Sequence, residues 1–402
     1  MDGIDAISLV EKYGSPLYVY SANCIEQQYN RLIRAFNGGK VCLNYAAKAL
    51  TNINVLKLMN KLGAGIDAVS VQEVKLALHA GYSPEKIGYT PSGVGFNEIE
   101  EAMSLGIKLT LDNLSSLEKF GQKYGALKPL TLRVNPNIMA GGNLKISTGH
   151  NDSKFGISVY QLPQIKQLIN KYNIQVVGLH MHTGSDILDV HVFLKAVDVL
   201  LQAAAGFEGL KFIDFGSGFK VPYKEDDYST DIELFGREVS NKQKEFCASY
   251  GSQVEFIFEP GKFLVSEAGY FLVSVNVVKE TLATTFVGVD SGQNHLIRPM
   301  FYDAYHRITN LSNPTGEKKL YSVVGYICET DTFAWNRNLN TIKEGDILAF
   351  HNAGAYCFSM SSNYNSRFRP AEVLIYKGKD LLIRQRETMG DLLRNQVEQN
   401  IV

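Results

Sequence analysis

The sequence predicts an α/β protein with an N-terminal TIM-type (β/α)8 barrel and a C-terminal all-β domain, a β-barrel or sandwich, that also takes the N-terminal strand. Between about residues 41 and 265, eight short apolar runs alternate with amphipathic helices, a pattern typical of parallel strands joined by right-handed crossovers. After about residue 265 helices become scarce, and runs rich in Val, Tyr, Phe and Thr are bounded by Gly, Asn and Asp. The lone segment SPLYVYS before the barrel is expected to pair with the β domain.

The elements follow in a regular order. The first segment, MDGIDAISLVEKYG, is acidic and predicts a short helix rather than a signal peptide. The eight predicted barrel strands are VCLNYA, AGIDAVS, KIGYTPS, IKLTLD, PLTLRVNP, IQVVGLHMH, LKFIDFG and VEFIFEPG. Helical stretches between them, such as SVQEVKLALHAG, FNEIEEAMSLG and DVHVFLKAVDVLLQAAAG, repeat apolar residues at i, i+3, i+4 and i+7. The expected boundaries are residues 26–265 for the barrel, and residues 1–25 with 266–402 for the β domain.

Two further stretches complete the order. The strands predicted for the β domain are YFLVSVNVVKET, TTFVGVDSG, KLYSVVGYICE, GDILAFHNAG and AEVLIYKG. The longest irregular stretch, NPNIMAGGNLKISTGHNDSKFG, follows the fifth barrel strand. Loops of this length are usually functional.

Composition narrows the function classes. The net charge of the 402 residues is -1, so no electrostatic footprint for nucleic acid or an anionic membrane is visible. No apolar run approaches the roughly 18 residues of a membrane span. The five cysteines are scattered and lack C-x-x-C pairing, which favours reduced thiols in a cytoplasm and no structural zinc or other metal site.

Polar groups collect where the predicted barrel strands end, which is where α/β barrels place catalytic residues. These strand ends carry Lys48, Asp67, Arg133, His182, FGSG at 215–218 and EPGK at 259–262. Any one of them could be an ordinary polar group near a loop. Six of them around one rim favour an active site.

Their chemistry fits pyridoxal phosphate. Lysine at the end of a buried strand is the residue that forms a Schiff base with this cofactor. The glycines after strands seven and eight suit a phosphate, because backbone N–H groups can approach an anion closely there. Glu259 can pair with the protonated pyridine nitrogen, and His182 can lie flat against the ring.

Seven motifs, in order along nearly the whole chain, resemble one family. They are YAAKA, GLHMHTGSD, FGSGFKVPY, IRPMFYDAYH, ICETDTF, GAYCFSMSSNYNSR and RQRETMGDLLR. They resemble the fold-type III pyridoxal phosphate decarboxylases, most closely the diaminopimelate decarboxylases. Ser217 and Lys220 stand where that family usually has glycine, and EPGK replaces its EPGR.

The resemblance implies residue roles. Lys48 would carry pyridoxal 5'-phosphate, Cys328 would be the acid that protonates the product carbanion, and Cys328 and Glu329 would come from the other subunit of an obligate homodimer. The cofactor would be surrounded by Asp67, His182, Ser185, Gly216, Ser217, Gly218, Glu259, Pro260, Gly261, Lys262 and Tyr356. The far end of the substrate would be held by Lys262, Arg298, Tyr302, Glu329 and Tyr356.

The first hypothesis for the activity is decarboxylation of meso-diaminopimelate to L-lysine and carbon dioxide. Arg298 and Glu329 supply the cation and anion that a second amino-acid end needs, although Arg298 could be a surface ion pair and Cys328 a small core residue. Lys262 keeps the charge of the family arginine but loses its planar fork, which leaves the exact substrate open.

Two other hypotheses remain. One is a decarboxylase of ornithine, lysine, carboxynorspermidine or a siderophore intermediate; ornithine enzymes resemble this chain but place Asp after the catalytic cysteine. The other is a catalytically dead regulatory homologue that only binds partners. The intact Lys48 and Cys328 argue against the latter.

Overall fold

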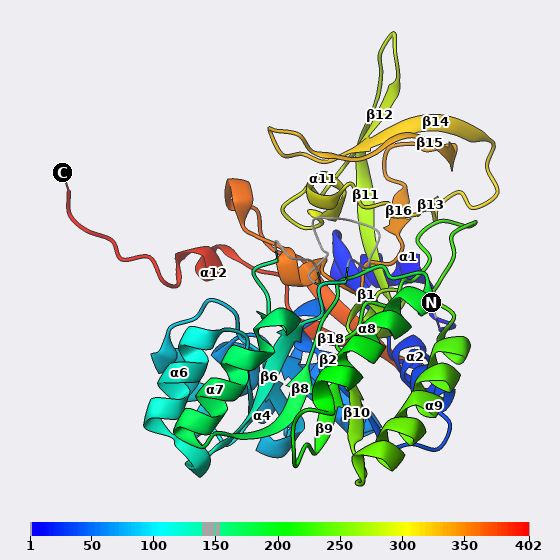
Figure 1. Cartoon of the computed structure of the whole chain (residues 1–402). Helices are drawn as coiled ribbons and strands as arrows, with labels where there is room; N and C mark the ends of the chain where they lie inside the picture. Colours follow the sequence, from blue (N-terminus) through cyan, green and yellow to red (C-terminus); the bar gives the residue numbers. More distant parts are fainter. Residues whose placement is uncertain (1, 139–148, 150–152, 402) are drawn as a thin grey trace. The chain divides into compact units, whose positions relative to one another are not determined.

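The computed structural model describes residues 2–138, 149 and 153–401, and the chain divides into two compact units (Figure 1). The barrel unit comprises Gln27–Val221 and Tyr228–Phe263. The β unit comprises Met1–Glu26, Pro222–Asp227 and Leu264–Val402. The short segment Pro222–Asp227 therefore groups with the β unit, although its neighbours in the sequence belong to the barrel unit.

The barrel unit contains the eight strands predicted from the apolar runs. They are β2 (Val41–Ala46), β3 (Gly65–Ala68), β4 (Ile87–Tyr89), β5 (Lys108–Leu111), β6 (Pro129–Asn135), β8 (Gln175–His180), β9 (Phe212–Asp214) and β10 (Glu255–Phe258). The sheet runs β5-β4-β3-β2-β10-β9-β8-β6-β7 with parallel neighbours throughout, and an additional β5–β6 pairing closes it. The predicted (β/α)8 barrel is thereby confirmed.

One strand of this sheet was not predicted. The two-residue strand β7 (Ile157–Ser158) pairs in parallel with the end of β6, with Val134 opposite Ile157. A pairing this short leaves no periodic pattern in the sequence.

Helices precede, connect and follow the barrel strands. They are α2 (Ala22–Ala35), α3 (Ile53–Leu62), α4 (Val71–His79), α5 (Phe96–Ser104), α6 (Leu114–Lys123), α7 (Leu162–Tyr172), α8 (Val190–Ala204), α9 (Ile232–Tyr250) and the short α10 (Lys262–Val265). Several begin at a residue whose side chain accepts from a backbone N–H of the first turn, as Ser70 does from Glu73 and Asp231 from Leu234. Such caps stabilise a helix start by about 1 kcal/mol. None of the helices in the described ranges has both the length and the apolar character needed to cross a membrane.

The β unit is built around a nine-stranded, mostly antiparallel sheet. Its strands are β1 (Leu17–Ser21), β11 (Gly269–Glu280), β12 (Thr285–Val289), β13 (Ile308–Asn310), β14 (Lys318–Val324), β15 (Thr332–Asn340), β16 (Ile347–Phe350), β17 (Ala371–Tyr376) and β18 (Lys379–Arg384). β1 lies between β11 and β17, with Val19 opposite Tyr270 and Val373. The expected pairing of the N-terminal strand with the β domain is confirmed.

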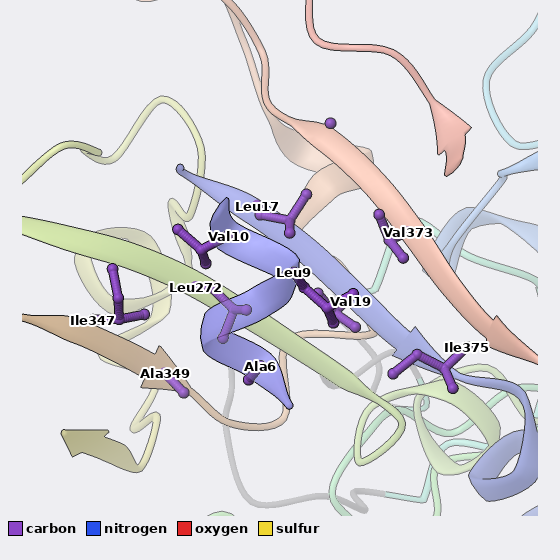
Figure 2. Close-up of a cluster of buried hydrophobic side chains, with 11 residues drawn as sticks. Ala6, Leu9, Val10, Leu17, Val19, Leu272, Ile347, Ala349, Val373 and Ile375 are labelled. Atoms are coloured by element: carbon purple, nitrogen blue, oxygen red, sulfur yellow. The ribbon is translucent and has the colours of Figure 1, made fainter. Parts of the chain in front are cut away.

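The predicted first helix is present as α1 (Ala6–Tyr13), and it packs on this sheet. Its buried residues Ala6, Leu9 and Val10 join one apolar cluster with residues of β1, β11, β16 and β17 (Figure 2). The Asp5 side chain caps the helix by accepting from the Ser8 backbone N–H at 3.0 Å. Burial of each leucine or valine contributes roughly 1.5–3 kcal/mol, which fixes the N-terminal segment to the β unit.

Candidate active site

Lys48 lies in a single 3-10 turn, Ala47–Ala49, directly after strand β2. Parallel pairing of β2 with β3 places Ala46 opposite Asp67, and the Lys48 ammonium lies 3.6 Å from a carboxylate oxygen of Asp67. The Lys48 side chain is 40% exposed, whereas that of Asp67 is only 3% exposed. The lysine at the mouth of a core strand therefore has a buried anion beside it and an exposed amine.

Burial shifts the protonation of Asp67. Withdrawal from water, reinforced by the charge of Glu259, raises the pKa of Asp67 to about 7, although Lys48 opposes the shift. Its Oδ1 atom has no hydrogen-bond partner within the described residues. This oxygen remains available to a polar group that enters the site.

Glu259 follows strand β10 and is buried against His180, the last residue of β8. His180 Nε2 lies 3.1 Å from Glu259 Oε2. Burial alone would raise the pKa of Glu259, but the hydrogen bond from His180 and the charge of Lys48 lower it to about 2. Glu259 is therefore an ionised carboxylate at neutral pH.

The loop after β9 is a backbone cradle. Gly216 and Gly218 have φ values of +63° and +146°. A Cβ at Gly216 would lie 2.6 Å from His182 Nδ1, and one at Gly218 would lie 2.3 Å from the Gly184 carbonyl oxygen. Only glycine fits either position, so the loop after β9 packs directly against His182 and the Gly184 carbonyl.

Two polar bonds hold this cradle. Gly216 N–H donates to Asp214 Oδ1 at 2.9 Å, and Ser217 N–H donates to His182 Nδ1 at 3.3 Å. Removal from water, with the nearby charges of Lys48 and Arg133, lowers the pKa of His182 well below its usual value. His182 is therefore neutral, with Nδ1 as an acceptor. The substituted Lys220 is directed elsewhere, since its Nζ donates to the Tyr228 carbonyl at 2.6 Å.

Lys262, which stands where the resembled family has arginine, forms an ion pair with Asp186. Its Nζ lies 2.8 and 2.9 Å from the two carboxylate oxygens of Asp186. Asp186 adopts φ +60°, a conformation uncommon for a residue with a side chain, so the loop after β8 is held in a defined shape at this point. The lysine charge is balanced within the barrel unit itself.

The remaining predicted barrel residues lie on the same strand ends or loops. Arg133 is buried near the end of β6, with its guanidinium carbon 4.8 Å from the centre of the Phe155 ring. The buried Pro260 and Gly261 form the turn after β10, and the Pro260 carbonyl accepts from the Ala46 N–H at 3.4 Å, beside the Lys48 turn. Ser185 lies in the loop after β8.

The other predicted site residues belong to the β unit. Arg298 begins the short helix α11 (Arg298–Tyr302) and is buried, which excludes a surface ion pair. Its Nη2 donates to the Tyr223 hydroxyl at 3.4 Å, and its guanidinium carbon lies 5.7 Å and 5.8 Å from the Tyr223 and Tyr302 ring centres. Tyr223 in turn bonds Ser266 at 3.1 Å. Arg298 is thus lined by two tyrosines.

Cys328 and Glu329 follow strand β14 and are both exposed, so Cys328 is not a core residue. Asn365 Nδ2 donates to Cys328 Sγ at 3.4 Å, and the Tyr364 hydroxyl donates to the Glu329 carboxylate. Adjacent residues of one turn thereby orient both side chains. Tyr356 has φ +58°, and a bulky residue in that conformation is a genuine outlier of the kind that clusters at functional sites.

Six residues of these two groups are not among the site residues predicted from the sequence: His180, Asp186, Asp214, Tyr223, Tyr364 and Asn365. His180 could have been found, because residues two apart on a strand share a face and His182 was already a candidate. Asp186 and Tyr223 act through partners that are distant in the sequence, and no local pattern marks such pairs.

Comparison with known proteins gives consistent matches over nearly the whole chain. Residues 22–266 match the family model described as the pyridoxal binding domain of pyridoxal-dependent decarboxylases. A diaminopimelate decarboxylase of Methanothermobacter thermautotrophicus is 40% identical over 405 residues, covering 98% of this chain and 94% of that protein.

Two solved structures are similar as well. The diaminopimelate decarboxylase from M. jannaschii in co-complex with L-lysine matches with a TM-score of 0.90 at 34% identity, covering 99% of this chain and 96% of that one. The diaminopimelate decarboxylase from Helicobacter pylori complexed with L-lysine matches with a TM-score of 0.89 at 32% identity, covering 97% and 98%.

Proposed function

The chain belongs to the pyridoxal-dependent decarboxylases, and from this membership we propose that it converts meso-diaminopimelate to L-lysine and carbon dioxide. The observation that carries the choice of substrate is the full-length similarity to diaminopimelate decarboxylases at 40% identity. Arg298 and Glu329 add chemical support, because a substrate with a second amino-acid end needs both a cation and an anion.

The barrel rim fits pyridoxal 5'-phosphate. Glycine at positions 216 and 218 lets the loop after β9 pack directly against the loop after β8, and a glycine-rich loop after a late barrel strand is a typical phosphate site. Lys48 supplies the amine for covalent attachment, ionised Glu259 supplies a partner for the pyridine nitrogen, and neutral His182 supplies a flat face for the ring. When bound, this cofactor accepts the electron pair released as the bond from Cα to the carboxylate breaks.

The chain's own groups perform the binding and proton transfers. Glu259 carries a negative charge, and beside the pyridine nitrogen of a bound cofactor it would favour a proton on that nitrogen. Cys328 Sγ delivers its proton to the carbon that has lost the carboxylate, and the resulting thiolate regains a proton from water. The Asn365 amide orients that sulfur through its hydrogen bond.

Recognition of the distal end is divided between two charges. Arg298, lined by Tyr223 and Tyr302, binds the distal carboxylate through its planar fork. Glu329, oriented by Tyr364, accepts from the distal ammonium. Lys262 and Tyr356 also contact the substrate. Lys262 does so while its ammonium stays paired with the Asp186 carboxylate.

A panel assay tests this function. The purified protein should release carbon dioxide from meso-diaminopimelate and form L-lysine in equal amount, and it should do so only after loading with pyridoxal 5'-phosphate. Release from ornithine or lysine in preference to diaminopimelate would identify one of the alternative decarboxylases. A protein that binds the cofactor but decarboxylates none of the panel would contradict the proposal.

Glu259→Gln is expected to retain the cofactor but lower kcat by about 100-fold or more. The amide has the same size but no charge, so the loss falls on the transition state, in which the ring accepts electrons, more than on binding. Measurement of kcat together with a cofactor titration checks this. A kcat within about threefold of native would correspond to less than about 1 kcal/mol, which is too little for the assigned role.

We further propose that the active form is a homodimer with shared sites. Cys328 and Glu329 are exposed, and the same β unit exposes Leu320 and Trp335 on β14 and β15. Exposed apolar side chains gathered on neighbouring strands are typical of a surface that a partner covers. A second copy of the chain would cover that surface and bring Cys328 to the partner's Lys48.

Mixing inactive Lys48→Ala with inactive Cys328→Ala should then restore activity. A hybrid dimer holds one site with both native residues and one site with neither. Random exchange of equal amounts of subunit makes about half of the dimers hybrids, so recovery of up to about one quarter of native activity is expected. Native mass spectrometry should verify that hybrids form. Hybrids without activity would contradict sharing.

The cytoplasm is the proposed compartment. All five cysteines are free thiols, as expected of a reducing environment.

A further inference from the structure

His180 is a buried polar residue that has no role in the proposed mechanism. It is the last residue of β8 and lies beneath the rim that holds His182, two residues further along the chain. We propose that His180 is a positioning residue, a neutral Nε2–H donor that fixes the orientation of the Glu259 carboxylate toward the cofactor. This inference rests on the proposed function and assigns a new residue to the same site.

The geometry supports a directed bond. His180 Nε2 lies 3.1 Å from Glu259 Oε2, and the two side chains are 2% and 8% exposed. A bond to one carboxylate oxygen leaves the second oxygen of Glu259 to face another partner. The strand ends of β8 and β10 are thereby linked through side chains as well as through the sheet.

The protonation state follows from the surroundings. Burial lowers the pKa of His180 despite the opposing effect of Glu259, so the imidazole is neutral. A neutral imidazole carries one hydrogen, and only a hydrogen on Nε2 can satisfy the Glu259 carboxylate. Nδ1 then carries a lone pair, and within the described residues it has no hydrogen-bond partner.

A neutral donor is better suited to this task than a cation. A charged histidine 3.1 Å from Glu259 would cancel the negative charge that the pyridine nitrogen requires. A neutral N–H orients the carboxylate and lowers its pKa without cancelling its charge. His180 therefore orients the Glu259 carboxylate without neutralising its charge.

Other titratable groups also act on Glu259, and one of them, Asp214, shares a side-chain hydrogen bond with it. They are Lys48 after β2, Asp67 on β3, Arg133 on β6, His182 after β8 and Asp214 on β9. Burial and the charge of Glu259 raise the pKa of Asp214 well above its usual value, so this acid is neutral. Its Oδ1 accepts from Gly216, which ties it to the glycine cradle.

The test compares His180→Gln with His180→Asn. The amide nitrogen of glutamine reaches the position of histidine Nε2, whereas that of asparagine corresponds to Nδ1 and falls short. His180→Asn should lower kcat by about 10- to 100-fold with KM within about threefold, and His180→Gln should recover most of the loss. Leu179→Met, a volume-conserving change at the neighbouring buried position, controls for packing within β8.

A spectroscopic readout accompanies the kinetics. Loss of the donor raises the pKa of Glu259, so the carboxylate becomes protonated at a higher pH. The change in the visible absorbance of the bound cofactor on acidification should therefore occur about one pH unit or more higher in His180→Asn than in the native protein or in His180→Gln. This measurement needs no substrate. Native protein that fails to bind the cofactor would overturn the proposed function, whereas an unchanged profile in His180→Asn would overturn only the role of His180.

A second measurement uses the native holoenzyme and requires only that His180→Gln folds, so that the His180 resonance can be assigned. Nitrogen-15 NMR of the eight histidines, with His180 assigned by its absence in His180→Gln, should show a neutral ring with its hydrogen on Nε2 at neutral pH. A doubly protonated ring, or a hydrogen on Nδ1, would overturn the proposal. Equal impairment of His180→Gln and His180→Asn, with both folded, would overturn it as well, because packing alone would then explain the loss.

Discussion

Lys48→Ala is expected to abolish decarboxylation together with covalent attachment of the cofactor. Lys48 sits on one turn at the end of β2, with its amine 40% exposed and 3.6 Å from buried Asp67. Alanine removes the amine and leaves the strand and turn intact. We expect kcat to fall by about 10³-fold or more, or about 4 kcal/mol in the activation free energy.

Lys48→Arg shows whether activity needs only the positive charge of Lys48 or also its covalent bond to the cofactor. Arginine keeps a cation beside Asp67 but stays protonated, so it cannot form the covalent bond. It should therefore be as inactive as Lys48→Ala. Lys57→Ala, an exposed lysine of α3, is the matched control and should retain activity. Borohydride reduction of the loaded protein followed by peptide mapping should label Lys48, and a label on another lysine would refute the assignment.

The barrel could be predicted because its signal is local. Eight apolar runs and the helices between them follow the periodicity of each element, and all eight strands lie within the predicted runs. The unpredicted strands carry weaker patterns. β7 has two residues, β13 has three, and β15 and β18 alternate many polar or charged residues at the surface. Such strands are recognised by their partners, which the sequence does not identify.

The candidate site also contains residues that a local rule predicts and residues that only the folded structure shows. The strand-end rule finds Lys48, Asp67 and Glu259 because parallel strands bring their carboxyl ends to one rim. The pairs His180–Glu259 and Lys262–Asp186 join residues 79 and 76 positions apart, and only the folded chain shows them. For the β unit, where no such rule exists, Arg298 and Cys328 were found by family resemblance alone, and their roles stay predictions.

The native protein is expected to use meso-diaminopimelate with a kcat/KM about 10⁴-fold above that for L-lysine or L-ornithine. L-lysine lacks the distal carboxylate and would leave the buried Arg298 without the substrate anion assigned to it. A site that leaves a buried polar group unpaired discriminates by about this factor. If L-lysine or L-ornithine is used within tenfold of diaminopimelate, the alternative decarboxylase takes the place of the proposed function.

Variants at the two cations show which of them carries this discrimination. Lys262 donates to the Asp186 carboxylate at 2.8 and 2.9 Å, whereas Arg298 donates to the Tyr223 hydroxyl at 3.4 Å. At Lys262, a substrate carboxylate must compete with the Asp186 carboxylate. At Arg298, it competes with the Tyr223 hydroxyl instead. Arg298→Lys, which loses the fork, should therefore lower the ratio of kcat/KM for diaminopimelate over L-lysine by about 10- to 100-fold. Lys262→Arg should change that ratio less. The reverse order would place the distal carboxylate at Lys262, and a protein that accepts diaminopimelate only as Lys262→Arg would have a different natural substrate.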